Sequence, residues 1–107
     1  MTALAQRTCR PVPPGTPPLS ESQIRQWLAE LPGWEIRDGQ LTKTFAFPDY
    51  YQTTAFLNAT AWVSHRQDHH PEILLGYNRI TLRYSTHSVK GLSENDFICA
   101  ARVEALL

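Results

Sequence analysis

The chain has few of the features that mark secreted proteins, zinc knuckles or membrane proteins. Its two cysteines, Cys9 and Cys99, lie far apart in the sequence, and neither belongs to a C-x-x-C pair. This spacing excludes a zinc knuckle and argues against a disulfide framework, so we expect free thiols in a reducing cytoplasm. The first ten residues lack the apolar run of a signal peptide, and no segment approaches the roughly 20 apolar residues of a membrane span. We therefore expect a cytoplasmic protein with no membrane partner.

The chain also lacks a surplus of either charge. Ten Lys and Arg residues balance ten Asp and Glu residues, and the basic residues are scattered along the sequence. Because nucleic acids normally attract a basic surface, we expect no nucleic-acid partner. Hydrophobic residues make up 42% of the chain and charged residues 19%, which is typical of a globular protein. A length of 107 residues is enough for one hydrophobic core but not for two.

Proline is concentrated near the N-terminus. The segment RPVPPGTPPL, residues 10–19, holds five of the eight prolines. Such a run forms neither a helix nor a central strand, because proline lacks a backbone N–H group and restricts the residue before it. We expect an extended or mobile N-terminal arm over residues 1–19, followed by a single domain over residues 20–107.

The first part of that domain reads as a helix and a hairpin. The letters S-E-S-Q from Ser20 predict a capping box, and apolar residues at helical spacing follow until the Pro-Gly pair at 32–33. Residues 34–47 alternate between apolar and polar side chains on both sides of Asp38-Gly39. This residue pair is preferred in two-residue hairpin turns, so the stretch predicts a β-hairpin.

A second helix is predicted after the hairpin. Asp49 is suited to the N-cap of this helix. Pro71 cannot continue the helix, so its last turn is expected near residues 68–69. Its predicted buried side is formed by Ala55, Phe56, Ala59, Trp62 and Val63.

Two strands and a helix complete the predicted order. The stretch EILLGY, residues 72–77, is nearly continuously apolar, which predicts burial on both faces or a position between subunits. Residues 80–85 alternate as a fourth strand, and Ser93 with Asp96 predicts a capping box for the last helix. The order α-β-β-α-β-β-α is packed most simply as an α+β fold, with an antiparallel sheet and helices on one face.

Three of the four histidines fall within the stretch SHRQDHHPE. His65 and His69 are four residues apart, which on a continuous helix is a zinc-binding spacing, as in H-E-x-x-H. No glutamate follows His65, however, and a third ligand would have to come from His87 or Asp96. Because isolated histidine pairs of this kind often bind nothing, we expect no metal.

Acid/base chemistry fits these residues better. The ordinary pKa of histidine, about 6.5, allows both protonation states at neutral pH. His69 and His70 lie next to each other at the expected helix end, so their rings can border one cleft from different directions. If the third and fourth strands pair, His87 returns to the same place. Asp96 could then orient one of the imidazoles.

Each candidate also has a purely structural explanation. Asp96 taken alone is better explained as the acidic half of a capping box. His65 is explained as a solvated helix residue, and His87 as a loop histidine with its hydrogen bonds satisfied. Asp68 and Glu72 are explained as surface carboxylates. The functional interpretation rests on the expected convergence of these residues at one end of the sheet.

The spacing of these residues resembles a known family. The motif H-R-Q-D-H-H-P is followed by Tyr77, His87 and Asp96 at intervals of five, nine and eight residues. This pattern is similar to the signature of the pterin-4a-carbinolamine dehydratases. The resemblance extends from about Cys9 to Leu107 and includes the stretches PPLS, LPGWEI, HHPEILLGYNRITL and THSVKGLSENDFICAARV.

The resemblance implies a fold, a reaction and an assembly. It implies a four-stranded antiparallel sheet with three helices on one face, in a homodimer that joins two sheets or in a homotetramer. It also implies dehydration of 4a-hydroxytetrahydropterin, a product of aromatic amino-acid hydroxylases, to quinonoid dihydropterin without a metal or organic cofactor. The implied catalytic residues are His69, His70 and His87, and the candidate substrate-binding or orienting residues are Asp68, Pro71, Glu72 and Asp96.

The residue types suit this reaction. The leaving oxygen at C4a needs a proton, and N5 must lose one, so an imidazolium and a neutral imidazole suffice. We expect His70 and His87 to transfer the protons and His69 and Asp96 to bind or orient. Some members of the family instead act as dimerisation cofactors of a transcription factor or assembly factors of a carbon-fixing enzyme. A non-catalytic protein-binding, assembly or dimerisation factor is therefore the alternative hypothesis.

Overall fold

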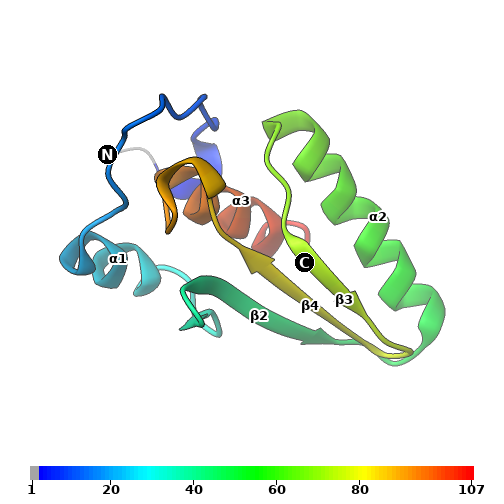
Figure 1. Ribbon diagram of the computed structural model, residues 1–107. Helices are drawn as coiled ribbons and strands as arrows, with labels where there is room; N and C mark the ends of the chain where they lie inside the picture. The colour runs from blue at the N-terminus through cyan, green and yellow to red at the C-terminus, as the bar shows by residue number, and fades with distance from the viewer. Residues whose placement is uncertain (1–2) are drawn as a thin grey trace.

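The computed structural model describes residues 3–107 and has a four-stranded antiparallel sheet with helices packed on one face (Figure 1). The predicted α+β class and the order α-β-β-α-β-β-α are confirmed. Within residues 3–107, no helix has the length and apolar composition to cross a bilayer. The elements are α1 (Glu21–Leu28), β1 (Glu35–Arg37), β2 (Gln40–Ala46), α2 (Tyr50–Gln67), β3 (Glu72–Leu75), β4 (Arg79–Tyr84) and α3 (Glu94–Glu104), with short 3-10 turns at Leu4–Gln6 and His87–Val89.

The strands lie in the order β1-β2-β4-β3, and every neighbouring pair is antiparallel. The predicted hairpin is confirmed, because Arg37 pairs with Gln40 across the turn and both Asp38 and Gly39 have positive φ angles. A turn with two consecutive positive φ angles has a backbone twist that matches the right-handed twist of the flanking strands. The register of β3 and β4 sets Glu72 opposite Arg83. The segment before β3 and the segment after β4 therefore meet at one end of the sheet.

Helix α3 occupies the centre of the core. It lies between the sheet, α2 and the N-terminal arm, and for this reason almost its whole circumference is buried. Helix α1 reaches the same core through Trp27, whose ring centroid is 5.6 Å from that of Phe97. The α3 residues without solvent exposure are Asp96, Phe97, Ile98, Cys99, Ala100 and Val103.

The predicted buried side of α2 is partly wrong. Phe56 and Val63 are buried, but Ala55 is exposed and Trp62 keeps 59% of its surface in solvent. Two threonines on the buried side can replace apolar residues, because their hydroxyls donate to backbone carbonyls of the same helix at 2.8 and 2.7 Å. The buried residues of α2 are Thr53, Phe56, Thr60, Val63 and Gln67.

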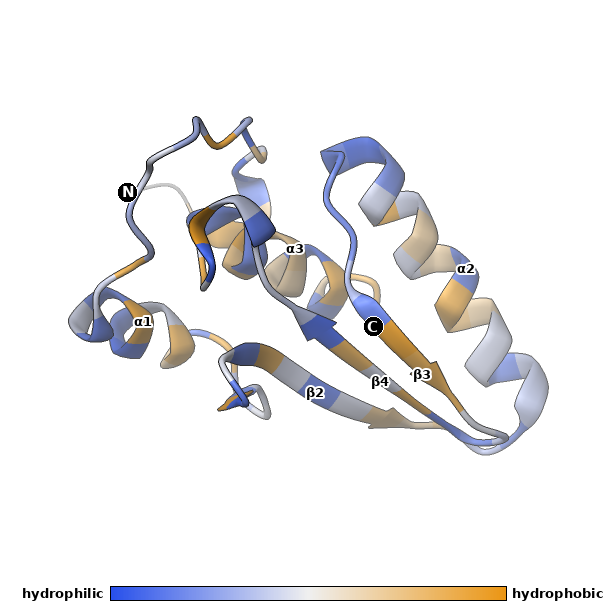
Figure 2. Cartoon of the chain, viewed as in Figure 1, coloured by the Kyte–Doolittle hydropathy of each residue, from blue (hydrophilic) through white to orange (hydrophobic). Residues whose placement is uncertain are grey.

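Strand β3 is an exposed edge strand. All four of its residues are solvent-accessible, so burial on both faces, one of two predicted alternatives, is wrong for a single chain. Figure 2 shows β3 as a hydrophobic stretch at the edge of the sheet, and Leu74 exposes 65% of its surface. The other alternative, a position between subunits, stays a prediction.

The N-terminal arm is held against α2 and α3. Leu4 is buried in the core, and the backbone N–H of Cys9 donates to Gln67 Oε1 at 2.8 Å. The guanidinium group of Arg102 donates to the carbonyl of Arg7 at 2.6 and 2.9 Å. The arm therefore covers one side of α3, while a domain boundary at residue 19 stays a prediction.

Two aromatic residues on α2 provide a matched test of its orientation. Phe56 is buried, whereas Tyr51 exposes 81% of its surface. We expect Phe56→Ala to lower the free energy of unfolding by about 3–5 kcal/mol, through lost burial and the cavity left behind. Tyr51→Ala should change it by less than about 1 kcal/mol. Urea denaturation followed by circular dichroism measures both, and equal losses would contradict the orientation of α2.

Candidate active site

The candidate site is formed by the segment before β3 and the segment after β4, which meet at the same end of the sheet. Helix α2 ends at Gln67, and Asp68 follows in the left-handed conformation, with φ 51° and ψ 43°. This residue turns the chain away from the helix axis, so His69 and His70 lie beyond the helix. His87 begins the 3-10 turn that follows β4.

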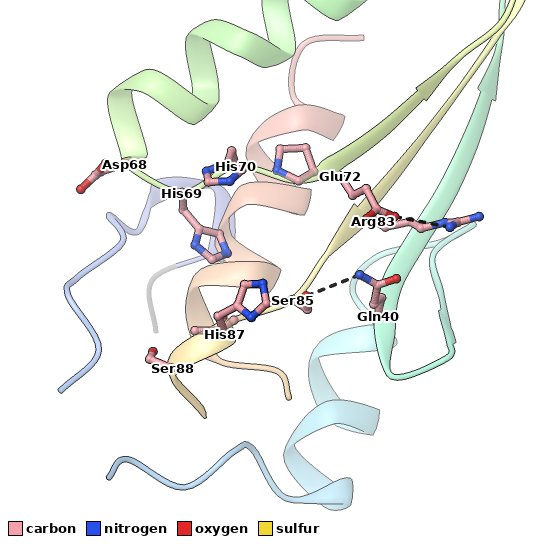
Figure 3. A pocket seen from close by; sticks show the side chains of 11 residues that line it. Gln40, Asp68, His69, His70, Glu72, Arg83, Ser85, His87 and Ser88 are labelled. Carbon is pink, nitrogen blue, oxygen red and sulfur yellow. Dashed lines mark hydrogen bonds and ion pairs between the residues drawn. The ribbon is translucent and has the colours of Figure 1, made fainter. Parts of the chain in front are cut away.

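These segments border a cavity of about 540 Å³. Figure 3 shows the rings of His69 and His87 turned into the same space between the two segments. His70 and His87 are exposed, whereas His69 is half-buried. The lining residues are Gln40, Asp68, His69, His70, Pro71, Glu72, Arg83, Ser85, Thr86, His87 and Ser88.

The cavity brings together all but one of the site residues expected from the sequence. Asp96 is the exception, since it does not line the cavity and lies behind His69 with no solvent exposure. Its Oδ1 atom is 2.6 Å from His69 Nε2. Its Oδ2 atom accepts hydrogen bonds from the backbone N–H of Ser93 at 2.9 Å and from the hydroxyl of Thr86 at 2.8 Å. Asp96 is thus both the acid of a helix cap and the partner of an imidazole.

The environment of His69 raises its pKa above the ordinary value. Burial alone would lower the pKa of this imidazole, because it disfavours the charged form. The hydrogen bond and negative charge of Asp96 outweigh burial, and Cys9 and Asp68 add to the effect. The ring also stacks on Tyr84, with centroids 6.1 Å apart and planes 14° from parallel. His69 is therefore held in a fixed orientation and favours its protonated form.

Several polar lining residues were not expected from the sequence. Arg83 Nη1 lies 3.5 Å from Glu72 Oε1, and Gln40 Nε2 donates to Ser85 Oγ at 3.5 Å. Arg83 and Ser85 belong to β4 or follow it, while Gln40 begins β2. The available signal for this contact was the unlike charge of Glu72 and Arg83. Only the strand register, however, places the two residues across from each other.

The zinc alternative is not supported by the geometry. Because α2 ends at Gln67, His65 and His69 do not share one face of a continuous helix. The ring of His65 instead packs on Trp62, with centroids 5.5 Å apart. Within residues 3–107, no three His, Cys, Asp or Glu side chains are grouped so that they could hold a metal ion.

Comparisons with known proteins agree with the family resemblance of the sequence. Residues 17–106 match the family described as pterin 4 alpha carbinolamine dehydratase. A protein of Nitrosomonas eutropha, provisionally named a pterin-4-alpha-carbinolamine dehydratase, is 51% identical over 97% of this chain and 93% of its own length. The chain therefore belongs to the pterin-4a-carbinolamine dehydratase family, whose name denotes a hydro-lyase.

Two solved structures are similar to this one. A protein of Brucella melitensis described as a transcriptional coactivator/pterin dehydratase has a TM-score of 0.79 and 34% identity, covering 83% of this chain and 97% of its own. A pterin dehydratase-like protein described as a RuBisCO assembly factor in the alpha-carboxysome has a TM-score of 0.57 and 34% identity. That match covers 68% of this chain and 84% of the other.

The contact between His69 and Asp96 predicts a specific pH dependence of stability. Because folding raises the pKa of His69, its stabilising effect is complete below the unfolded value of about 6.5. The effect is lost as the pH rises through the folded pKa. His69→Gln should cost about 1.5–3 kcal/mol near pH 5.5, a typical value for a charged hydrogen bond, and less near pH 9. Denaturant titrations from pH 5 to 9 measure this difference.

His65→Gln is the matched control, since His65 packs on Trp62 rather than on Asp96. This variant should follow the pH profile of the wild type. A cost of His69→Gln that stays constant or grows with pH would contradict a charged His69 partner for Asp96.

Proposed function

We propose that this protein dehydrates 4a-hydroxytetrahydropterin to quinonoid dihydropterin and water by histidine acid/base catalysis. Membership of the family supports the reaction. The observation that carries the mechanism is that His69, His70 and His87, from two separate segments, line one cavity of about 540 Å³. The product would return to the cofactor cycle of aromatic amino-acid hydroxylases in the cytoplasm.

The reaction needs two proton transfers. A neutral imidazole takes the proton from N5, and the electron pair of the N5–H bond forms the C4a=N5 double bond. The C4a–O bond breaks as an imidazolium gives its proton to the leaving oxygen, which departs as water. We assign these transfers to His70 and His87, which are exposed to the cavity. Positioned acids and bases of this kind typically contribute about 10²–10⁴ in rate.

His69 is suited to binding rather than to proton exchange. Its Nε2 atom is engaged by Asp96, which leaves Nδ1 as the ring nitrogen available to a ligand. An imidazolium held by a buried carboxylate is a fixed hydrogen-bond donor, so it can position an oxygen or nitrogen of the pterin ring.

The carboxylates at the cavity suit the pyrimidine ring of the pterin. The pyrimidine ring of a pterin carries N–H donors, and Asp68 and Glu72 offer acceptors on the cavity wall. Arg83 contacts Glu72 and would orient its carboxylate. Pro71 is buried beside the two histidines and restricts the backbone between α2 and β3.

Substitution of the two proposed proton-transfer residues tests the mechanism. His70→Ala and His87→Ala should each lower kcat by about 10²–10⁴, and the double variant should leave only the uncatalysed rate. The measurement is the loss of 4a-hydroxypterin absorbance after subtraction of the uncatalysed reaction. His65→Ala is the control, because His65 does not line the cavity, and it should keep wild-type activity. Full activity in the double variant would remove the proton-transfer assignment.

We also propose that the protein is a homodimer, or a homotetramer built from such dimers, in which the sheets join at β3. The free edge of β3 offers unpaired backbone groups, and Ile73, Leu74 and Leu75 are partly exposed beside it. Exposed apolar edge strands favour pairing with another chain. This assembly would give the hydrophobic residues of β3 a partner.

A charge at the β3 edge should weaken this assembly. Leu74→Lys is expected to raise the dissociation constant of the dimer by about tenfold or more, since it buries an unpaired charge. Sedimentation velocity over a dilution series measures the change. Ile36→Lys in β1, the opposite edge strand, is the matched control and should leave the assembly intact. Dissociation by Ile36→Lys alone would move the interface to β1.

The similarity to the RuBisCO assembly factor supports the alternative of a non-catalytic binding or assembly protein. The retained set of His69, His70, His87 and Asp96 favours the enzyme, because a pure binding protein does not need it. A purified chain without dehydratase activity that binds a stoichiometric protein partner would reverse this preference.

A further inference from the structure

The two cysteines, expected from the sequence to be free thiols, lie side by side. The Sγ atoms of Cys9 and Cys99 are 3.6 Å apart. Cys9 belongs to the N-terminal arm and Cys99 to α3, so the fold joins residues separated by 90 positions. Neither thiol has a part in the proposed dehydration.

Hydrogen bonds at Cys9 and at the next residue maintain this approach. Its backbone N–H donates to Gln67 Oε1 at 2.8 Å, which ties the arm to the end of α2. The next residue, Arg10, exchanges two hydrogen bonds with the side chain of Asn95 in α3, at 3.1 and 2.7 Å. The arm is thus fixed to both helices at the point where the sulfurs meet.

The two thiols differ in access to solvent. Cys99 is fully buried, whereas Cys9 is half-buried and lines a second cavity of about 220 Å³. His69 and Thr86 line both this cavity and the larger one, so the two cavities are neighbours. A small reagent from solvent would meet the sulfur of Cys9 first.

We propose that Cys9 and Cys99 form a thiol modification site at which a hydroperoxide drives reversible closure of an intramolecular disulfide. The sulfur of Cys9 attacks the O–O bond of the peroxide, so an S–O bond forms and an alcohol or water leaves. Cys9 has then become a sulfenic acid, because it has given the peroxide the two electrons that reduce it. Cys99 next attacks that sulfur, the S–S bond replaces the S–O bond, and the departing hydroxide leaves as water with the thiol proton.

Solvent access, which Cys9 has and Cys99 lacks, and the surrounding charges together assign these roles. The hydrogen bond with Cys99 and the positive charges of His69 and Arg102 lower the pKa of Cys9. Together they outweigh burial and the negative charge of Asp96, which raise it. The same hydrogen bond, together with burial, raises the pKa of Cys99. Because the thiolate is the nucleophile, Cys9 reacts first and Cys99 resolves the product.

Closure requires only a local movement. The sulfurs must approach from 3.6 Å to about 2.05 Å, and Cys9 lies outside the helices and strands, in the arm segment that its hydrogen bonds hold beside α3. Cys99 Sγ lies 3.8 Å from the backbone carbonyl of His69, so the disulfide would form directly beside the candidate active site.

Controlled oxidation of the reduced full-length protein tests the proposal. Treatment with one to about ten equivalents of hydrogen peroxide should remove both thiols together and lower the intact mass by about 2 Da. An unreduced proteolytic digest should contain a peptide that links Cys9 to Cys99 within one chain, and dithiothreitol should restore both thiols. These readouts do not depend on dehydratase activity, so they are separate from the test of the proposed function.

Two variants separate the roles of the sulfurs. In Cys99→Ser, Cys9 should still react but gain about 16 or 32 Da, because no resolving thiol is present. In Cys9→Ser, the buried Cys99 should be oxidised at least about tenfold more slowly than in the wild type. The proposal is overturned by a wild-type protein that gains oxygen without a cross-link, links two chains, or does not react. Equal oxidation rates for Cys99 in the wild type and in Cys9→Ser would also overturn it.

Discussion

The carboxylate of Asp96 is buried without solvent and is the point at which three separate chain segments meet. It contacts His69 after α2, Thr86 after β4 and the backbone of Ser93 at the start of α3. A buried charge is tolerated only when its hydrogen-bonding capacity is met, so these three segments cannot move independently. The wall of the histidine cavity therefore depends on this one side chain, although the side chain does not face the cavity.

The antiparallel register of β3 and β4 supplies the second constraint. Because Glu72 lies opposite Arg83, the chain before β3 and the chain after β4 end side by side, and each carries a histidine segment. The left-handed Asp68 then turns His69 and His70 away from α2. A helix continued through His69 would direct these rings differently, so the end of α2 matters to the site as much as the sheet does.

Much of the fold could be predicted from short segments, but less of the packing. The hairpin at Asp38-Gly39 is confirmed, whereas the buried side of α2 was only partly predicted. Counting apolar residues placed Trp62 inside and overlooked Thr60, whose hydroxyl is satisfied within its own helix. For the site, the spacing of the histidines indicated their convergence, but not the polar wall that Arg83 contributes.

The sequence by itself determined the features that depend on neighbouring residues. Turn residues, helix caps and strand alternation act over a few positions, because they satisfy nearby backbone groups or set local φ and ψ angles. Only the tertiary structure decided that Asp96 serves both a cap and His69, and that Cys9 meets Cys99. These contacts join residues that are far apart in the chain, and their geometry follows from the packing of the arm, α2, α3 and the sheet around one core.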